Sequence, residues 1–531
     1  MSPSARTPVR VRAGLRLSPG DGIRLATDLY LPGDATRHPV VLLRTYLGKS
    51  RHLGEALGWA RAGFACVVQD VRGRYDSDGA WRPYGHEIRD GAATVAWIAE
   101  QPWCDGRICP TGGSYGAYTA WAAAGAGTAA VIAAVPAMHP VNFDGGALKL
   151  LNHVYWWTTH GDSRTERTGL AEAMLNAEPD LLRHLPVDDL PGRLWADLPG
   201  FASALRADAP SPPIGGDHLG ALSCPTLHLG GWHDPFVAES LRQWRTAGAR
   251  LAPRPARGLL IGPWTHELKS GETATYGERR YGPASRRPLG PLEVRWLRAA
   301  LGLGDEAPEP PVRLYFGGAE RWWEGNDWPA TGRRSFFPGA AGLLAETPDL
   351  SAAADGFRSD PNDPFPSRSG PVDQRDLHAR TDAVRWTSPP LSRPLALCGA
   401  PRVEIEGEST APSCDWLARL CEVLPDGRSL YLAGALIESR VEPGGRHRVA
   451  IELSPLAHRL PAGHRLLLEI AGSHFPEHAR NPQTGAPRTT AAVLRPARQT
   501  VFRSGTRLEI PEAPDEALRD DPSTNARREP R

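Results

Sequence analysis

The sequence predicts an α/β protein with an inserted helical segment, followed by an all-β domain. Near-continuous apolar runs at residues 39–45 and 64–69 alternate with helical patterns, which is typical of strands buried in a parallel sheet. This alternation stops at about residue 142 and resumes at about residue 225. Beyond residue 311 the pattern changes to short alternating runs bounded by Gly, Pro or Asp, which is typical of a β-sandwich.

The elements of the α/β part follow in a simple order. Two strands are predicted within residues 13–31, around the turn Pro19-Gly20-Asp21-Gly22. The further predicted strands cover residues 39–45, 64–69, 108–111, 131–135, 225–231 and 257–262, and the predicted helices cover residues 54–62, 90–101, 117–124 and 291–301. Strands that alternate with helices in this way form βαβ units around a parallel sheet.

The domain boundaries come from changes in composition. Residues 1–141 and 224–304 are assigned to the α/β core, and residues 142–223, rich in Trp, Leu, Arg and Pro, to a helical cap. A proline-rich linker follows at Gly304–Pro311. Residues 312–514 are predicted to form a jelly roll, and the charged residues 515–531 a disordered tail. A chain of 531 residues is long enough for these two or three domains.

Composition excludes several classes of function. There are 61 basic and 60 acidic residues, so the sequence shows neither the excess of positive charge typical of a nucleic-acid-binding protein nor a polybasic membrane anchor. No apolar run is long enough for a membrane span, and the first residues, Met1–Arg12, lack the apolar stretch of a signal peptide, so the cytoplasm is expected. The seven cysteines include no C-x-x-C pair, which favours buried thiols over a metal centre or disulfides. No metal and no cofactor is expected.

The segment Gly112-Gly113-Ser114-Tyr115-Gly116 matches G-x-S-x-G, the nucleophile elbow of α/β-hydrolases. A predicted strand precedes it and an alanine-rich helical segment follows it, which is the order that this motif requires. The sharp turn exposes the serine hydroxyl and tolerates only small neighbours. Ser114 is therefore the predicted nucleophile, and a simple glycine turn is the alternative.

The acid and the base are predicted from the strands that follow. In α/β-hydrolases the order along the chain is Ser, then Asp or Glu, then His, each at the carboxyl end of a core strand. Asp234 is the first carboxylate after the strand at 225–231, and His266 is the first histidine after the strand at 257–262. Competing acids lie in the cap region, except Glu239, which lies one helical turn further on. His233 precedes the strand that must supply the base, so it is a candidate pocket residue instead.

A tetrahedral oxyanion needs two hydrogen-bond donors. The backbone N–H of Tyr115, the residue after the nucleophile, is the first candidate. The second is the hydroxyl of Tyr46, which follows the strand at 39–45. From position alone, Tyr46 is equally consistent with an aromatic residue that packs in the core.

The loop that begins Arg72-Gly73-Arg74 offers two interpretations. Its arginines could bind an anionic ligand. Paired arginines more often bind carbonyl and carboxylate groups inside a fold. We interpret this loop as structural.

Ordered sequence blocks resemble the cocaine esterase and X-Pro dipeptidyl-peptidase family of serine hydrolases over about residues 15–510. The blocks in the α/β part are Arg44-Thr45-Tyr46, Gln69-Asp70-Val71-Arg72-Gly73-Arg74, Trp103-Cys104-Asp105-Gly106, Gly113-Ser114-Tyr115, Gly231-Trp232-His233-Asp234, Phe236-Val237 and Gly262-Pro263-Trp264-Thr265-His266. Further blocks are Trp322–Trp328, Asp360-Pro361-Asn362-Asp363-Pro364, Leu424-Pro425-Asp426-Gly427-Arg428, Leu460-Pro461-Ala462-Gly463-His464-Arg465, Phe475-Pro476 and Arg480-Asn481.

The resemblance implies a hydrolase core, a helical cap and a C-terminal jelly roll. It implies the triad Ser114, Asp234 and His266, with the Tyr46 hydroxyl in the oxyanion hole. Phe236 resembles a residue that lines the acyl pocket in the cocaine esterase branch, and Trp156 or Trp157 is expected to do similar work from the cap. Two residues depart from the family pattern, because Pro235 replaces the usual glycine after the acid and Gly116 replaces the glutamate of the α-amino-acid ester hydrolase branch.

These observations predict a serine esterase or amidase that acts on a small-molecule ester or amide with a bulky, partly apolar group. Three alternatives stay open: an acyltransferase on the same triad, an X-Pro-type dipeptidyl peptidase, and a ligand-binding protein with an inactive hydrolase core. No nucleic-acid or membrane partner is expected, and a homodimer is compatible with the sequence.

Overall fold

The computed structural model describes residues 8–34, 36–125, 127–139, 143–206, 214–304, 310–329, 332–351, 353–368, 370–514 and 518. The predicted tail at 515–531 therefore lies outside the described residues, apart from Leu518. Within the described ranges, none of the helices combines the length and the apolar composition needed to cross a membrane.

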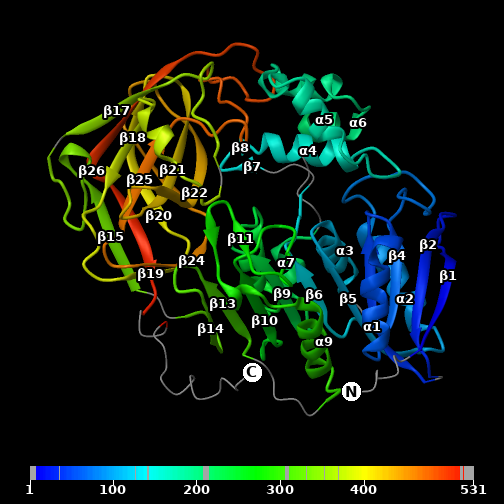
Figure 1. The fold of residues 1–531 in the computed structure, drawn as a ribbon. Coiled ribbons are helices and arrows are strands. Elements are labelled where there is room, and N and C mark those ends of the chain that lie inside the picture. Colours follow the sequence, from blue (N-terminus) through cyan, green and yellow to red (C-terminus); the bar gives the residue numbers. More distant parts are fainter. Residues whose placement is uncertain are drawn as a thin grey trace.

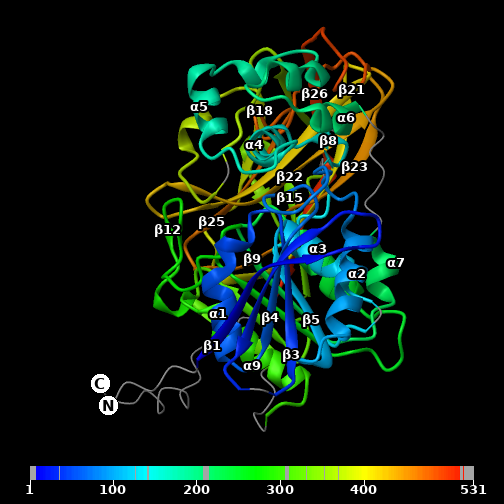
Figure 2. The same ribbon diagram turned by 90° about the vertical axis from the view of Figure 1, so that its right-hand side faces the viewer.

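A ten-stranded sheet forms the α/β part (Figures 1 and 2). Its strand order is β1-β2-β4-β3-β5-β6-β9-β10-β13-β14, and the strands from β4 to β13 run parallel to one another. The strands are β1 (Val9–Leu17), β2 (Leu25–Pro32), β3 (His38–Thr45), β4 (Ala65–Asp70), β5 (Cys104–Gly113), β6 (Val131–Ala134), β9 (Thr226–Gly231), β10 (Arg257–Gly262), β13 (Val312–Phe316) and β14 (Arg321–Gly325).

Helices cover both faces of this sheet. Successive side chains of a strand point to opposite faces, so each strand packs against both layers of helices. Val41 and Leu43 pack toward α1 (Leu53–Arg61) and α9 (Leu289–Ala300). Their neighbours Val40 and Leu42 pack toward a second layer of helices. That second layer contains α2 (Glu87–Ala99), α3 (Tyr115–Ala123) and α8 (Val237–Thr246). Burial on both faces explains why the strands appear as continuous apolar runs.

One predicted strand belongs to a different sheet from the one expected. Val312–Phe316 was expected to open the jelly roll, but as β13 it pairs in parallel with β10. All five of its residues are buried, as in the other central strands of the α/β sheet. β14 then adds an antiparallel edge strand, so the β domain begins only with β15 (Gly332–Pro338).

The segment between β6 and β9 is helical, as expected; in Figure 1 its helices α4, α5 and α6 stand above the sheet, whereas α7 lies beside the sheet near α3. Its apolar cluster includes Trp157 and Phe201, and it also takes in Phe475 and Ala479 from the β domain. The elements are β7 (Phe143–Asp144), β8 (Ala147–Leu148), α4 (Leu150–His160), α5 (Leu170–Ala177), α6 (Pro199–Arg206), α7 (Gly216–Gly220) and the 3₁₀ helices Leu181–Arg183 and Val187–Arg193.

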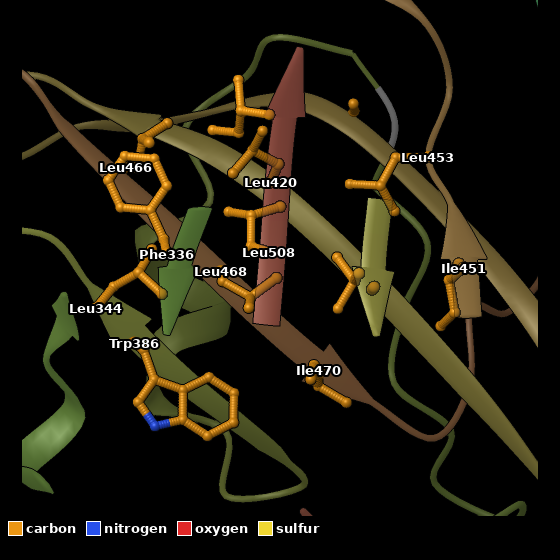
Figure 3. Close-up of a cluster of buried hydrophobic side chains, with 14 of the residues drawn as sticks. Phe336, Leu344, Trp386, Leu420, Ile451, Leu453, Leu466, Leu468, Ile470 and Leu508 are labelled. Carbon is orange, nitrogen blue, oxygen red and sulfur yellow. The ribbon is translucent and has the colours of Figure 1, made fainter. Parts of the chain in front are cut away.

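The β domain is a sandwich of an eight-stranded and a four-stranded sheet. Apolar side chains from both sheets meet in one cluster, in which Trp386 and Leu468 of one sheet lie near Phe336 and Leu508 of the other (Figure 3). The larger sheet contains β15, β16 (Leu344–Ala345), β17 (Ala354–Ser359), β19 (Leu395–Gly399), β20 (Arg402–Ser409), β23 (His447–Glu452), β24 (Leu456–Leu460) and β26 (Ala497–Glu512). The smaller contains β18 (Ala383–Thr387), β21 (Ser413–Val423), β22 (Ser429–Arg440) and β25 (Arg465–Ala471).

Candidate active site

Ser114 lies at the sharp turn between β5 and α3. Its backbone has φ 57° and ψ −125°, a left-handed conformation that non-glycine residues rarely adopt. The turn is so tight that a Cβ atom at Gly112 would lie 2.4 Å from the carbonyl oxygen of Gly116. The glycine at the first motif position is therefore required by sterics, and the turn presents the serine side chain at the carboxyl end of the sheet.

The loops that carry the acid and the base touch each other. The backbone N–H of His233 donates to the carbonyl of Trp264 at 3.0 Å, and the N–H of Trp232 donates to that of Gly262 at 2.9 Å. A Cβ atom at Gly231 would lie only 2.1 Å from the Trp264 carbonyl oxygen, so this close approach needs glycine. Because β9 and β10 are neighbours in the sheet, their loops project from the same edge.

The three predicted catalytic side chains form one hydrogen-bonded line. His266 Nε2 lies 3.0 Å from Ser114 Oγ, and His266 Nδ1 lies 2.8 Å from Asp234 Oδ1. The Asp234 side chain is fully buried, whereas about a third of the His266 side chain is exposed. A buried carboxylate at Nδ1 holds the imidazole in the tautomer whose Nε2 can accept a proton from the serine.

Tyr46 lies beside this line. Its hydroxyl lies near the side chains of both Ser114 and Trp156. The indole N–H of Trp156 can only donate, so it cannot accept the proton of the Tyr46 hydroxyl, and that O–H can donate elsewhere. Burial raises the pKa of Tyr46, so the phenol keeps its proton at neutral pH.

Aromatic rings hold Tyr46 in place from several sides. Trp81 stacks parallel to it with ring centroids 6.2 Å apart, and the Tyr115 ring meets it edge-on at 5.1 Å. The rings of Trp156 and His160, both in α4, approach to 6.1 Å and 5.0 Å. The phenol is thus fixed by residues of both the α/β part and the helical segment.

Tyr115 places only its backbone toward the nucleophile. Its hydroxyl donates to the carboxylate of Glu87 and accepts the backbone N–H of Tyr84 at 3.0 Å. The ring is completely buried, and this burial, followed by the charge of Glu87, raises the pKa of the phenol. Because α3 begins at Tyr115, its backbone N–H belongs to the first turn, where helix donors have no carbonyl partner within the helix.

The arginine loop is structural, as expected. Arg72 binds both carboxylate oxygens of Asp90, at 2.9 and 2.6 Å. Arg74 is completely buried and donates to the carbonyl of Tyr46 at 2.8 Å and to that of His160 at 3.1 Å. Arg74 therefore joins the loop that carries Tyr46 to the end of α4.

The two neighbouring tryptophans of α4 lie in different environments. Trp156 is half-buried and contacts Tyr46. Trp157 is 2% exposed and stacks on Phe201 inside the apolar cluster of the helical segment, at 5.4 Å and 15°. The structure thus brings Trp156 to the site, and it corrects the expectation that Trp157 lines a substrate pocket, because successive helical residues point about 100° apart.

Phe236 and His233 also lie in different environments. The Phe236 ring meets the His266 ring edge-on at 5.3 Å, so Phe236 borders the reacting groups. His233 instead bonds the hydroxyl of Tyr281, and burial, followed by the charges of Arg279 and His458, lowers its pKa to about 3. It lines a cavity of about 920 Å³ between the α/β part, α4 and the β domain, whose described wall includes Asp234 but not Ser114.

Sequence reasoning missed the residues that support Tyr46. Trp81 and His160 contact its ring, and neither was singled out. The Arg72-Gly73-Arg74 block indicated part of this arrangement, because a buried arginine must bind a carbonyl or carboxylate group near it. His160 gave none, because its contact with Tyr46 depends on how the helical segment packs against the sheet.

An α/β sheet that presents serine, imidazole and carboxylate in one hydrogen-bonded line defines a serine hydrolase. The X-Pro dipeptidyl-peptidase (S15 family) model matches residues 21–267, and the model of the X-Pro dipeptidyl-peptidase C-terminal non-catalytic domain matches residues 306–509. Cocaine esterase of Rhodococcus sp. (strain MB1 Bresler) is 30% identical over 88% of this chain and 91% of its own length. A putative serine esterase of Mycobacterium bovis is 26% identical over 86% and 90%.

Two solved structures share the whole fold. An α-amino acid ester hydrolase superposes with a TM-score of 0.84 at 21% identity, covering 96% of this chain and 98% of its own. An aminopeptidase from a marine sediment Thaumarchaeota archaeon gives a TM-score of 0.83 at 21% identity, covering 96% and 97%. The chain belongs to the X-Pro dipeptidyl-peptidase (S15) family, and it is a serine hydrolase of the esterase type.

Proposed function

We propose that this protein hydrolyses a small-molecule ester or amide through an acyl-enzyme on Ser114. His266 is the general base, Asp234 orients it, and the Tyr46 hydroxyl and the Tyr115 N–H form the oxyanion hole. The observation that carries the proposal is the continuous line from Ser114 Oγ to His266 at 3.0 Å and from His266 to Asp234 at 2.8 Å.

The first half-reaction forms the acyl-enzyme. Ser114 Oγ attacks the acyl carbon while its proton passes to His266 Nε2. The negative charge that develops on the former carbonyl oxygen is stabilised by the two donors of the oxyanion hole. The tetrahedral intermediate then collapses, and His266 gives its proton to the departing alcohol or amine.

The second half-reaction releases the acid. Water loses a proton to His266 and attacks the acyl carbon, and Ser114 leaves with that proton restored. Throughout, Asp234 remains ionised and stabilises the transient imidazolium. Its complete burial beside Nδ1 strengthens this interaction, because water cannot screen it.

Trp156 acts as a positioning residue in this scheme. Its indole lies beside the Tyr46 ring and its N–H can only donate, so the phenolic O–H is directed away from the indole. The parallel stacking of Trp81 on the Tyr46 ring restricts the phenol further. An oxyanion donor that is fixed before the reaction needs little reorganisation when charge develops.

We propose substrates with a bulky, partly apolar group. Phe236 and Trp156 are half-buried aromatic residues at the site, and such side chains favour apolar substrate groups. The relatives named cocaine esterase and α-amino acid ester hydrolase point to esters as the preferred class. Screening p-nitrophenyl esters and amino-acid amides of increasing acyl size would identify the preferred group and separate esterase from X-Pro peptidase activity.

A fluorophosphonate probe tests the proposal directly. It should form one covalent adduct on Ser114 in the folded protein, seen by intact mass and peptide mapping. Ser114→Ala should remove both the adduct and ester turnover, with a loss on the order of 10⁶ in kcat, while its unfolding temperature stays near that of the wild type. Failure of the folded wild type to react would instead favour a ligand-binding protein.

Product analysis separates hydrolysis from acyl transfer on the same triad. With an alcohol or amine acceptor present, a hydrolase should still release mainly free acid, and an acyltransferase should form more acyl adduct than acid. We further propose a cytoplasmic location, because all seven cysteines are buried free thiols. A homodimer remains a prediction that sedimentation of the purified chain can test.

A further inference from the structure

A second cluster of chemically active side chains lies outside the proposed catalytic line. It occupies the turn after β25, in the sequence His474-Phe475-Pro476-Glu477-His478. Each of the two histidines and the glutamate offers one ligand atom, and these atoms all lie within 4.8 Å of one another.

The turn is held rigidly at the junction of the β domain and the helical segment. Ser367 N–H donates to the Phe475 carbonyl at 2.7 Å, and Glu477 N–H donates to Ser367 Oγ at 3.2 Å. On the other side, Ala479 N–H donates to the Leu148 carbonyl at 2.9 Å. Donor atoms on a backbone fixed from both sides are preorganised for a ligand.

Burial is uneven across the cluster. His474 and His478 are 5% and 3% exposed, whereas the Glu477 side chain is 36% exposed and lines the cavity of about 920 Å³. The ring nitrogens of a neutral imidazole are common metal ligands. The carboxylate at the cavity wall leaves a route for an ion to enter.

The distance between one pair of these ligand atoms fits a shared metal ion. His474 Nδ1 lies 3.5 Å from Glu477 Oε2, beyond the usual range of a hydrogen bond. Ligands at 2.0–2.2 Å from a tetrahedral ion are about 3.4 Å apart, because the angle between them is near 109°. The guanidinium of Arg480 does not compete for this space, since it donates to the carbonyls of Pro361 and Arg183.

We propose that His474, Glu477 and His478 bind one divalent transition-metal ion of the Zn²⁺ class. Two imidazoles and one carboxylate are a donor set that Zn²⁺ accepts with a fourth position left open. All three ligands come from one turn, so the ion fixes the shape of that turn, which hydrogen-bonds to both neighbouring segments. Its role is to stabilise the junction, and the proposed catalytic line does not depend on it.

The test uses the full chain, first stripped with a chelator and then equilibrated with Zn²⁺. After gel filtration, elemental analysis should find one zinc per chain, and titration calorimetry should give a single site. Zn²⁺ should also raise the unfolding temperature, because a ligand that binds only the folded state stabilises it. Co²⁺ in its place should give the visible absorption bands of a low-symmetry site.

Glu477→Gln and His478→Gln should each weaken zinc binding by at least ~10-fold, the effect that even outer partners of metal ligands produce. Glu55→Gln is the matched control, since His52 and Glu55 form a His–Glu pair of the same sequence spacing, 2.9 Å apart. This variant should retain one zinc. A wild-type chain that retains no zinc, or variants that bind it as tightly as the wild type, would overturn the proposal.

Discussion

The sheet and α4 both supply residues to the candidate site, but their sequences encode those residues differently. Ser114, Asp234 and His266 each follow the carboxyl end of a strand, and the strand order of the sheet brings these ends together. Trp156 and Trp157 are adjacent in α4, yet one contacts Tyr46 and the other lies inside the apolar cluster.

Position in the sequence is informative for residues at strand ends and much less so for residues on a short helix. Parallel strands lie about 4.8 Å apart with their carboxyl ends at one edge, so a residue just past a strand end has few places to go. A residue on a short helix can face any direction, and only the packing of that helix decides which. The predictions below test whether this contrast holds for function.

After the loss of the nucleophile itself, substitution of the acid should show the largest effect. Asp234→Asn should lower kcat by ~10⁴, because an amide at Nδ1 no longer fixes the imidazole tautomer. The measurement is single-turnover acylation with a p-nitrophenyl ester. Glu239→Gln is the matched control, since this half-buried carboxylate lies five residues further on and binds Arg242 and Gln243 instead. If the two variants were equally impaired, the acid could not be identified as the first carboxylate after a strand end.

Tyr46→Phe should slow acylation by ~10²–10³, the usual loss for one oxyanion donor. The ring and its stacking on Trp81 are retained, so substrate binding should change little and the effect should appear in kcat. Tyr118→Phe serves as the control, because this hydroxyl contacts the carbonyl of Tyr84. A Tyr46→Phe rate close to that of wild type would remove Tyr46 from the oxyanion hole.

The sheet and the triad geometry could be predicted from the sequence because each depends on local rules. Fully apolar runs predict buried strands, and the G-x-S-x-G spacing predicts the elbow, where Gly112 proves sterically required. The assignment of Val312–Phe316 was wrong, because a short apolar strand fits either sheet equally well. Only the pairing with β10 decides between them.

The surroundings of Tyr46 could not be predicted for a different reason. The contacts of Trp156 and His160 with Tyr46 depend on where α4 packs against the sheet. The sequence of α4 gives its helical period but not its rotation or height above β3. Arg74 shows the same limit, since its carbonyl partner His160 lies 86 residues away.

Substitution of the two tryptophans should separate stability from activity. Trp157→Ala should lower the free energy of unfolding by about 3–5 kcal/mol, the usual cost of removing a large buried aromatic side chain. Trp156→Phe should leave stability nearly unchanged but slow acylation, by roughly 10-fold, because the Tyr46 hydroxyl loses the polar N–H that lies beside it. Calorimetry and acylation rates measure the two effects, and the reverse pattern would contradict the assignment.

The pH dependence should give the smallest effect and the finest test of the base. Protonated His266 cannot accept the serine proton, so kcat/KM should fall by up to ~10-fold per pH unit on the acid side. His160 cannot cause this fall between pH 5 and 8, because burial and the charge of Arg74 lower its pKa to about 3 and it stays neutral there. His233, also with a pKa lowered to about 3 by burial, is excluded in the same way.

Asp70 is a competing group near the Tyr46 loop, because burial raises its pKa to about 6 and it ionises within the same range. Its carboxylate accepts the backbone N–H of Lys49 at 2.7 Å, close to Tyr46 in the chain, so its protonation could disturb the Tyr46 loop. Asp70→Asn removes that titration. If His266 is the base, kcat/KM of this variant should still fall at acid pH. If the fall disappears, protonation of Asp70 and its effect on the Tyr46 loop caused it, and proton transfer to His266 would not explain the pH profile.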